Sequence, residues 1–457
     1  MKMNRAVLGV VILIALLGAS CQGPTGPGSQ NGGGSGGGNA SEGPVPDIAK
    51  LLAEDGAADD RFGWSVALSG DYAIVGAIGD TVNGANSGSA YVFRRTGPGT
   101  WDDGTKLLPL EPDGVTSDGD SGDQFGSSLA ISGDYAIVGV SLDDDNGTNS
   151  GSAYVFRRTG ANTWDSGTKL LPLAPDGVTS DGEADDQFGL SVSISGDYAI
   201  VGSPYDNGQA GSAYVFRRTG TNTWDAGTKL TASDGASNDR FGWSVAMSGD
   251  FAIVGAIDDD DNGTNSGSAY VFRRTGGTEL NTWDTGTKLL PLAPDGVTSD
   301  GAASDRFGWS VAIGGDYALV GAPNNDDNGS NTGSAYSFHR TGGTEPNTWD
   351  AGAKLLPMDV DGGDLLGESV AIGGDYAVVG AKSDNENGTN AGSAYVFRRT
   401  GVNAWDAGSR LTPSDNTADD FLGRSVAVSG DFAIVSASND DDNGSDSGSA
   451  YEFSLLP

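Results

Sequence analysis

The stretch FGWSVALSGDYAIVGA, residues 62–77, decides the fold, because seven copies of it follow one another along the chain. The other copies begin at Phe125, Phe188, Phe241, Phe307, Leu366 and Leu422. Their starts lie 53 to 66 residues apart. A repeat of this length is typical of arrays in which each unit is one small supersecondary structure.

Each unit predicts four short strands, which in the first copy are SVALS (65–69), YAIVGA (72–77), SAYVF (89–93) and KLLPL (106–110). They are rich in Val, Ile, Tyr, Phe and Leu and are bounded by Gly, Asn, Asp and Pro. Ser-Gly-Asp or Gly-Gly-Asp separates the first two strands, with Gly where a type II′ hairpin needs it. No stretch after residue 47 has the apolar spacing of a helix. We therefore expect an all-β protein, a seven-bladed propeller of four-stranded antiparallel blades.

The two ends of the repeat region predict how the ring closes. Residues 48–52 (Ile-Ala-Lys-Leu-Leu) resemble the KL-type fourth strand and precede the first unit, whereas the chain ends just after the third strand of the last unit, Ala450 to Phe453. We therefore expect residues 48–52 to complete the seventh blade.

The N-terminus has the features of an export signal. Lys2 and Arg5 precede an apolar run, Ala6 to Leu17, which is too short for a comfortable membrane span. Residues 1–21 resemble a bacterial lipoprotein signal, which implies lipidation of Cys21. The alternative is an ordinary secretory signal with an incidental Cys.

The chain after the signal divides into two parts. Residues 22–46 are rich in Gly, Ser and Pro and predict a flexible tether, and residues 47–457 form the propeller domain. An envelope location, attached to the membrane through the N-terminal lipid only, follows if Cys21 is lipidated.

The composition of the chain excludes several classes of partner and of functional site. The formal charge is −37, so a nucleic-acid partner is not expected. One Cys and one His exclude a disulfide framework, a Cys/His zinc site and a haem. His339 replaces the first Arg of a repeated Arg-Arg pair, which indicates a solvated repeat variant and not a catalytic base. We expect no enzyme, and an enzyme acting on extracellular polymer is the least favoured alternative.

Acidic residues gather on one predicted face. The loops between second and third strands, together with the stretches before each FG, hold 42 of the 62 acidic residues, and we call their side the acidic face. The opposite side, the turn face, has the Gly-Asp turns and the TWD segments. We expect Arg-Arg pairs there, with fourth-strand cations such as Lys106 and Arg410, and hence near neutrality.

Two acidic loops are candidate Ca²⁺ sites. Asp258, Asp260 and Asn262 offer oxygen atoms at alternate positions before a Gly, and Asp441 and Asn443 form a second such set. Neither loop has a later bidentate carboxylate, so the affinity expected is that of weak extracellular modules. The alternatives are solvated acidic loops and simple Asn-Gly turns.

The nine Trp fall into two groups. Trp64, Trp243 and Trp309 follow FG, and the other six belong to TWD or AWD segments. Their regular recurrence favours packing between blades, with a sugar-binding Trp ring as the alternative. The Arg-Arg pairs are expected to neutralise nearby Asp and to cover Trp faces.

A few residues break the repeat. They are Glu368, Lys382, Arg424 and the short loop 205–208. We expect no acid–base pair among them.

The repeated FG and GA pairs resemble FG-GAP repeats, the units of the integrin α-subunit propeller, and most closely the bacterial form DQFGxSVAISGDYAIVGA…DDDNGxxSGSAYVF. The resemblance covers residues 48–457 and implies an extracellular propeller used for binding or adhesion. The Ca²⁺ loop of integrin-type repeats is replaced here by the Ser-Gly-Asp turn, so those metal sites are not implied.

The expected protein is thus a non-enzymatic binding or adhesion module of a bacterial envelope, a monomer with an extracellular protein or polysaccharide ligand and with Ca²⁺ as a candidate modulator. A purely structural envelope protein is the alternative.

Overall fold

The computed structural model describes residues 45–111, 114–174, 179–277, 280–292, 299–342 and 347–456. The predicted signal segment 1–21 and nearly all of the predicted tether 22–46 lie outside these residues. No helix in the described ranges is long and apolar enough to cross a membrane. Ser41–Pro457 forms one compact unit.

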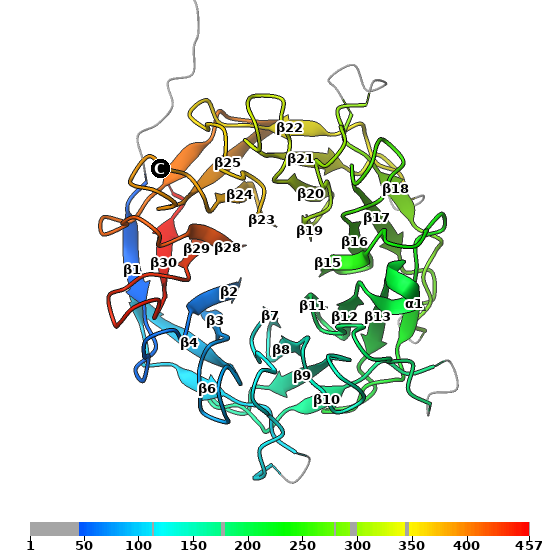
Figure 1. Cartoon of the computed structure of the whole chain (residues 1–457), viewed down its shortest axis with the longest axis vertical. Coiled ribbons are helices and arrows are strands. Elements are labelled where there is room, and N and C mark those ends of the chain that lie inside the picture. Colours follow the sequence, from blue (N-terminus) through cyan, green and yellow to red (C-terminus); the bar gives the residue numbers. More distant parts are fainter. Residues whose placement is uncertain are drawn as a thin grey trace, which may run out of the picture. The chain divides into compact units, whose positions relative to one another are not determined.

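This unit is a ring of seven antiparallel sheets, as predicted (Figure 1). The first blade contains β2 (Phe62–Ser69), β3 (Tyr72–Ala77), β4 (Ser89–Gly97) and β6 (Thr105–Leu107), with the short β5 (Thr100–Trp101) beside β4. The second blade contains β7 (Ser128–Ser132), β8 (Tyr135–Val140), β9 (Ser152–Arg157) and β10 (Thr168–Leu170), and the third contains β11 (Val192–Ser195), β12 (Tyr198–Ser203), β13 (Ser212–Arg217) and β14 (Thr228–Leu230). The fourth blade contains β15 (Phe241–Ser248), β16 (Phe251–Ala256), β17 (Ser268–Arg273) and β18 (Thr287–Leu289), and the fifth contains β19 (Ser310–Gly314), β20 (Tyr317–Ala322), β21 (Ser334–His339) and β22 (Ala353–Leu355). The sixth blade contains β23 (Ser369–Gly373), β24 (Tyr376–Ala381), β25 (Ser393–Gly401), β26 (Ala404–Trp405) and β27 (Ser409–Leu411).

The seventh blade closes the ring with both ends of the repeat region. It contains β28 (Leu422–Ser429), β29 (Phe432–Ala437), β30 (Ser449–Ser454) and, on the outside, β1 (Asp47–Leu51). Lys50 of β1 pairs with Tyr451, the same register in which Lys106 pairs with Tyr91 in the first blade. The predicted closure is confirmed, with the strand one residue earlier than expected.

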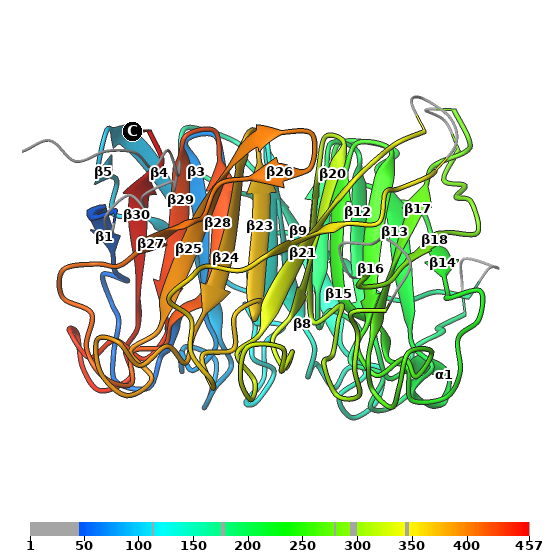
Figure 2. The same cartoon turned by 90° about the horizontal axis from the view of Figure 1, so that it is seen from above.

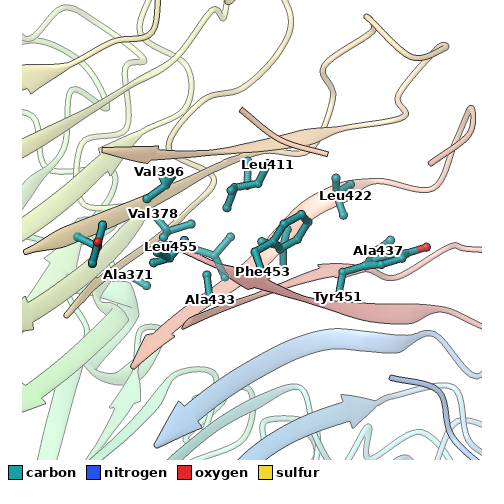
Figure 3. Close-up of a cluster of buried hydrophobic side chains, with 14 residues drawn as sticks. Ala371, Val378, Val396, Leu411, Leu422, Ala433, Ala437, Tyr451, Phe453 and Leu455 are labelled. Atoms are coloured by element: carbon teal, nitrogen blue, oxygen red, sulfur yellow. The ribbon is translucent and has the colours of Figure 1, made fainter. Parts of the chain in front are cut away.

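The FG and GA motifs hold neighbouring blades together. Phe62 packs edge-on against Tyr91 and Phe93, with ring centroids 5.6 and 5.9 Å apart. A Cβ on Gly76 would overlap the carbonyl oxygen of Gly126, the FG glycine of the next blade. Two backbones therefore approach closely where only glycine fits. Buried apolar side chains fill the spaces between blades, as Figure 3 shows for the sixth and seventh.

The turns between strands define the two faces. In each Gly-Asp turn the central Gly has a positive φ, 56° at Gly70, which fits the predicted type II′ hairpin. The long loops lie on the opposite face, the lower edge in Figure 2, where the shortened loop of the third blade contains α1 (Asp206–Gln209). This element is a turn, since Asn207 and Gly208 have left-handed φ angles of 55° and 68°. The fourth strands are shorter than predicted: β6 ends at Leu107 before Pro109, and β14 ends at Leu230 although no Pro follows it.

Candidate functional site

The residue that follows FG differs from blade to blade and lines a cavity on the propeller axis. FG begins the innermost strand of each blade, so the next side chain lies near the acidic-face end of the channel. The seven residues at this position are Trp64, Ser127, Leu190, Trp243, Trp309, Glu368 and Arg424. All of them line one cavity of about 500 Å³. This volume is in the range of small-molecule sites.

Aromatic rings form much of the wall. Trp243 and Trp309, from neighbouring blades, lie with ring centroids 5.1 Å apart and an interplanar angle of 48°. Trp64 contributes the third indole, and the guanidinium of Arg424 lies 3.4 Å from its centroid. The three indoles are half-buried, so they stay accessible to a ligand.

Ion pairs surround the cavity on the acidic face. Lys382 donates a hydrogen bond to the carboxylate of Glu368, so the structure joins two of the predicted pattern-breaking residues. The buried carboxylate of Asp258 forms ion pairs with the guanidinium groups of Arg240, at 2.9 Å, and Arg306, at 3.6 Å. Burial raises the pKa of Asp258, and the two guanidinium groups oppose this shift.

Arg424 is, with Glu368, one of the two predicted pattern-breaking residues that line the cavity. Burial lowers the pKa of its guanidinium to about 10, the nearby Glu368 opposes this shift, and Arg61 adds to it. Sequence comparison between repeats found Glu368, Lys382 and Arg424 individually. It missed that the seven residues after FG form a ring around the propeller axis, because they come together only when the seven blades close into a propeller.

A second network repeats around the outer part of the acidic face. In the fourth blade, buried Asp259 accepts hydrogen bonds from Ser268 (2.8 Å) and Tyr270 (3.0 Å) and pairs with Lys288 at 2.8 Å. Lys288 also pairs with Asp234 and Asp261. Lysine side chains are long enough to reach from the fourth strand to these loops.

The fourth-strand cations therefore belong to the acidic face, and the prediction that Lys106 and Arg410 neutralise the turn face was wrong. Lys106 pairs with Asp55 and Asp80, and Arg410 with Asp384 and Glu386. The equivalent cations of the other blades are Lys169, Lys229, Lys288, Lys354 and Lys50. The acidic face is consequently less negative than the loops alone indicate.

A third row of acids precedes FG by two residues. Their carboxylates accept a backbone hydrogen bond three residues upstream, as Asp186 does from the amide of Glu183 at 2.7 Å. Burial raises their pKa, and the shift brings it to about 6 at Asp123, Asp186, Asp364 and Asp420.

The candidate Ca²⁺ residues have separate partners. Asp258 faces two arginines, whereas Asp260 accepts the amide hydrogen of Asn265 and the Asn262 amide donates to Ser266. In the described ranges no group of three or more His, Cys, Asp or Glu side chains is arranged to hold a metal ion.

The second candidate loop is similar. Asp441 accepts the amide hydrogen of Asp446 at 2.8 Å, and the amide of Asn443 donates to Ser447. Ca²⁺ binding at either loop stays a prediction. Cys21 lies outside the described residues.

The tryptophans divide as the sequence grouped them, but with different roles. The six TWD and AWD tryptophans pack against the apolar clusters of the blades, which confirms their packing role. The three after FG line the cavity instead. The second Arg of the repeated pair neutralises an Asp in blades two to six, as Arg158 does with Asp134, whereas Arg95 of the first blade pairs with Glu452. It covers Tyr or Phe more than Trp, as Arg158 covers Tyr72 at 4.3 Å.

His339 fits its reading as a repeat variant. Its ring packs against Tyr317, with centroids 4.9 Å apart, and its backbone amide donates to Asp350 as the equivalent Arg amides do in other blades. It lies on the turn-face side of the sheet and does not line the cavity.

Comparison with known families agrees with the fold. The FG-GAP repeat model matches residues 46–93, 115–156, 178–216, 224–272, 297–338, 349–397 and 405–453. No curated protein matches the chain. The fold is consistent with a binding or structural module. These seven matches cover most of the chain, which therefore belongs to the FG-GAP repeat family.

Proposed function

We propose that this protein is a non-enzymatic binding module that holds its ligand in the axial cavity. The observation that carries the proposal is the convergence of pattern-breaking residues on one cavity. A ring used only for packing would have similar residues in each blade, as the preceding FG position has, with Phe in five blades, Leu in two and Gly after it in all seven. The position after FG instead combines three Trp, an acid, a base, a hydroxyl and an apolar chain.

The cavity supports binding better than catalysis. Glu368 is the single carboxylate among the described residues that line it, and Lys382 already pairs with this group. Glycoside hydrolysis ordinarily needs two carboxylates across one bond. Acyl transfer needs a nucleophile with a base beside it, and the one His does not line the cavity.

The same proposal includes the location and attachment of the module. Lipidation of Cys21 would fix the chain to a bacterial envelope, and a Gly-rich tether of this length spans roughly 25–30 Å. A protein or polysaccharide outside the cell could then reach the cavity. Calcium, if it binds the outer loops, would modulate the acidic face around the cavity mouth.

A thermal-shift panel tests the binding function. Residues 41–457 form a compact unit that can be used directly. The panel contains sugars, sugar acids, amino acids and short peptides, and the variant is Trp309→Leu, which introduces the residue that blade three has at this position, Leu190. We expect at least one compound to raise the Tm of the wild type, to act less on the variant, and to be recovered unchanged.

Three outcomes would contradict the proposal. Equal shifts in wild type and variant would place binding elsewhere. Chemical conversion of a compound would indicate an enzyme. A panel without any shift would favour the purely structural alternative.

A further inference from the structure

Two arginines that lie against Trp64, a residue of the cavity wall, lack a carboxylate partner among the described residues. Arg424 and Arg61 both lie against Trp64, with guanidinium carbons 3.4 and 5.8 Å from the ring centroid. Among the described residues, neither has an acidic oxygen within 4.0 Å. Their mutual repulsion acts in the same direction as burial on the pKa of Arg424. Two cations thus lie beside one indole, and neither forms an ion pair among the described residues.

The other cations near the cavity are neutralised. Arg240 and Arg306 share Asp258, and Lys382 binds Glu368. The charge of Glu368 also acts on Arg424, but the Glu368 carboxylate is already hydrogen-bonded to Lys382. The positive charge beside Trp64 is therefore available to a ligand, although the chain as a whole has a charge of −37.

That overall charge does not prevent an anion from binding at this point. The Debye length at physiological ionic strength is about 8 Å, so charges on the outer loops are largely screened at the axis. Guanidinium groups bind carboxylates through paired, charge-assisted hydrogen bonds, and such bonds strengthen where water is partly excluded. A ligand with one or few negative charges is favoured over a long polyanion.

The indoles specify the rest of the ligand. Trp243 and Trp309 form an angled aromatic wall that suits a flat, partly apolar ring face. Hydroxyl side chains also line the cavity, among them Ser127 and Ser141, and offer hydrogen bonds to a hydroxylated ligand. A sugar ring combines one C–H-rich face with hydroxyl groups at its edge.

We propose that the cavity binds a carboxylate-bearing sugar, with its carboxylate on Arg424, whose positive charge the nearby Arg61 reinforces, and its ring face on the Trp243–Trp309 wall. This inference rests on the proposed function and specifies its ligand. The sugar acid is either free or the end unit of a short oligosaccharide, since both present the same carboxylate and ring.

Isothermal titration of residues 41–457 tests the ligand class. The probes are glucuronate, galacturonate and mannuronate, the neutral sugars glucose, galactose and mannose, and acetate. Matched oligouronates of two to four units distinguish a free sugar acid from a chain end. We expect at least one uronate to bind about tenfold or more tightly than its neutral sugar, the size of effect that one charged hydrogen bond gives, and acetate to bind weakest.

Variants then assign the contacts. Arg424→Ser introduces the residue that blade two has at this position, Ser127, so the fold is expected to tolerate it. This variant should lose about tenfold in uronate affinity and leave neutral-sugar binding unchanged, whereas Trp309→Leu should weaken both. Arg424→Lys, which keeps the charge without the fork, should give an intermediate affinity. Arg398→Ser removes an exposed Arg of the turn face and is the matched control.

Failure of this inference can be told apart from failure of the proposed function. Equal binding of uronates and neutral sugars, equal binding of acetate, no uronate binding, or full uronate affinity in Arg424→Ser would each overturn the ligand class. If other panel compounds still required Trp309, the binding function would stand. If no compound depended on Trp309, both would fail.

Discussion

Glu452 of the seventh blade and Arg95 of the first form a buried ion pair, with oxygen and nitrogen 2.7 Å apart. Glu452 replaces the Val of the repeated SAYVF segment, and its other oxygen accepts a hydrogen bond from Trp101 at 2.9 Å. In the second, fourth and fifth blades an Asn performs this last role, as Asn162 does for Trp164, but Gly99 occupies the equivalent position in the first blade. Two departures from the repeat therefore compensate each other where the ring closes.

Replacing this buried acid should weaken the closure. Glu452→Gln leaves Arg95 charged and without its anion, so we expect a loss of about 3–5 kcal/mol in the free energy of unfolding. Glu54→Gln, at an exposed position, is the control and should change stability by less than about 0.5 kcal/mol. Urea denaturation measures both. A loss for Glu452→Gln no larger than the control would show that the pair does not hold the ring.

The N-terminal strand should be equally important for stability. A chain beginning at Ala53 lacks β1, so it exposes the edge of β30 and leaves Asp440 without Lys50. We expect a large fall in Tm. Lys50→Met keeps the strand but removes its charge, and should cost about 1–3 kcal/mol because a buried carboxylate then lacks a partner. An unchanged Tm for the shortened chain would contradict the closure by residues 47–51.

Stability should rise as the pH falls from 7 toward 5. The pKa of Asp186 is about 6 in the folded protein, against about 3.9 in an unfolded chain. Between these values the folded state binds more protons than the unfolded state, so stability falls as the pH rises through this window. Asp123, Asp364 and Asp420 act in the same direction.

Asp186→Asn isolates one of these groups. Its amide oxygen can still accept the hydrogen bond from Glu183, but it does not ionise. We expect the Tm of the variant to depend less on pH between 5 and 7 than that of the wild type. Identical Tm curves against pH would mean that this carboxylate ionises with its ordinary pKa.

Calcium binding by loop 258–263 can be measured separately. The ion would have to displace Arg240 from Asp258, so we expect a weak site with a Kd of about 10⁻⁴–10⁻³ M. At about 10 mM, Ca²⁺ would then add about 1–3 kcal/mol of stability by mass action. Mg²⁺ at matched ionic strength should add less, and Asp260→Asn should reduce the difference. Equal shifts with both ions would remove the metal site from the account.

Much of the fold could be predicted because each local signal is repeated seven times and agrees with the others. Phe62, the Gly-Asp turns and the short apolar strands fix blade architecture, and residues 48–52 indicated the closure. The placement of Lys106 could not be read from its strand, because the reach of a long side chain decides which face it serves. The role of Trp64 depends on blades that lie far apart in the sequence and meet only at the axis.

The candidate site was predicted in its parts and not as a whole. Glu368, Lys382 and Arg424 stood out as departures from the repeat, yet the cavity that Glu368 and Arg424 share depends on ring closure. The ion pair between Glu452 and Arg95 was not predicted, because the two residues belong to opposite ends of the chain. Comparison of equivalent repeat positions would have marked Glu452, since six other units have Val or Ser there.

The central claim is that the axial cavity holds the ligand, and fluorine NMR of protein labelled with 5-fluorotryptophan tests it most directly. Each of the nine Trp gives one resonance, and Trp→Phe substitutions assign those of Trp64, Trp243 and Trp309. Adding the best compound of the panel should shift these three resonances and leave the six turn-face resonances in place. Shifts confined to the turn-face tryptophans would contradict the account and would move the binding site to the opposite side of the propeller.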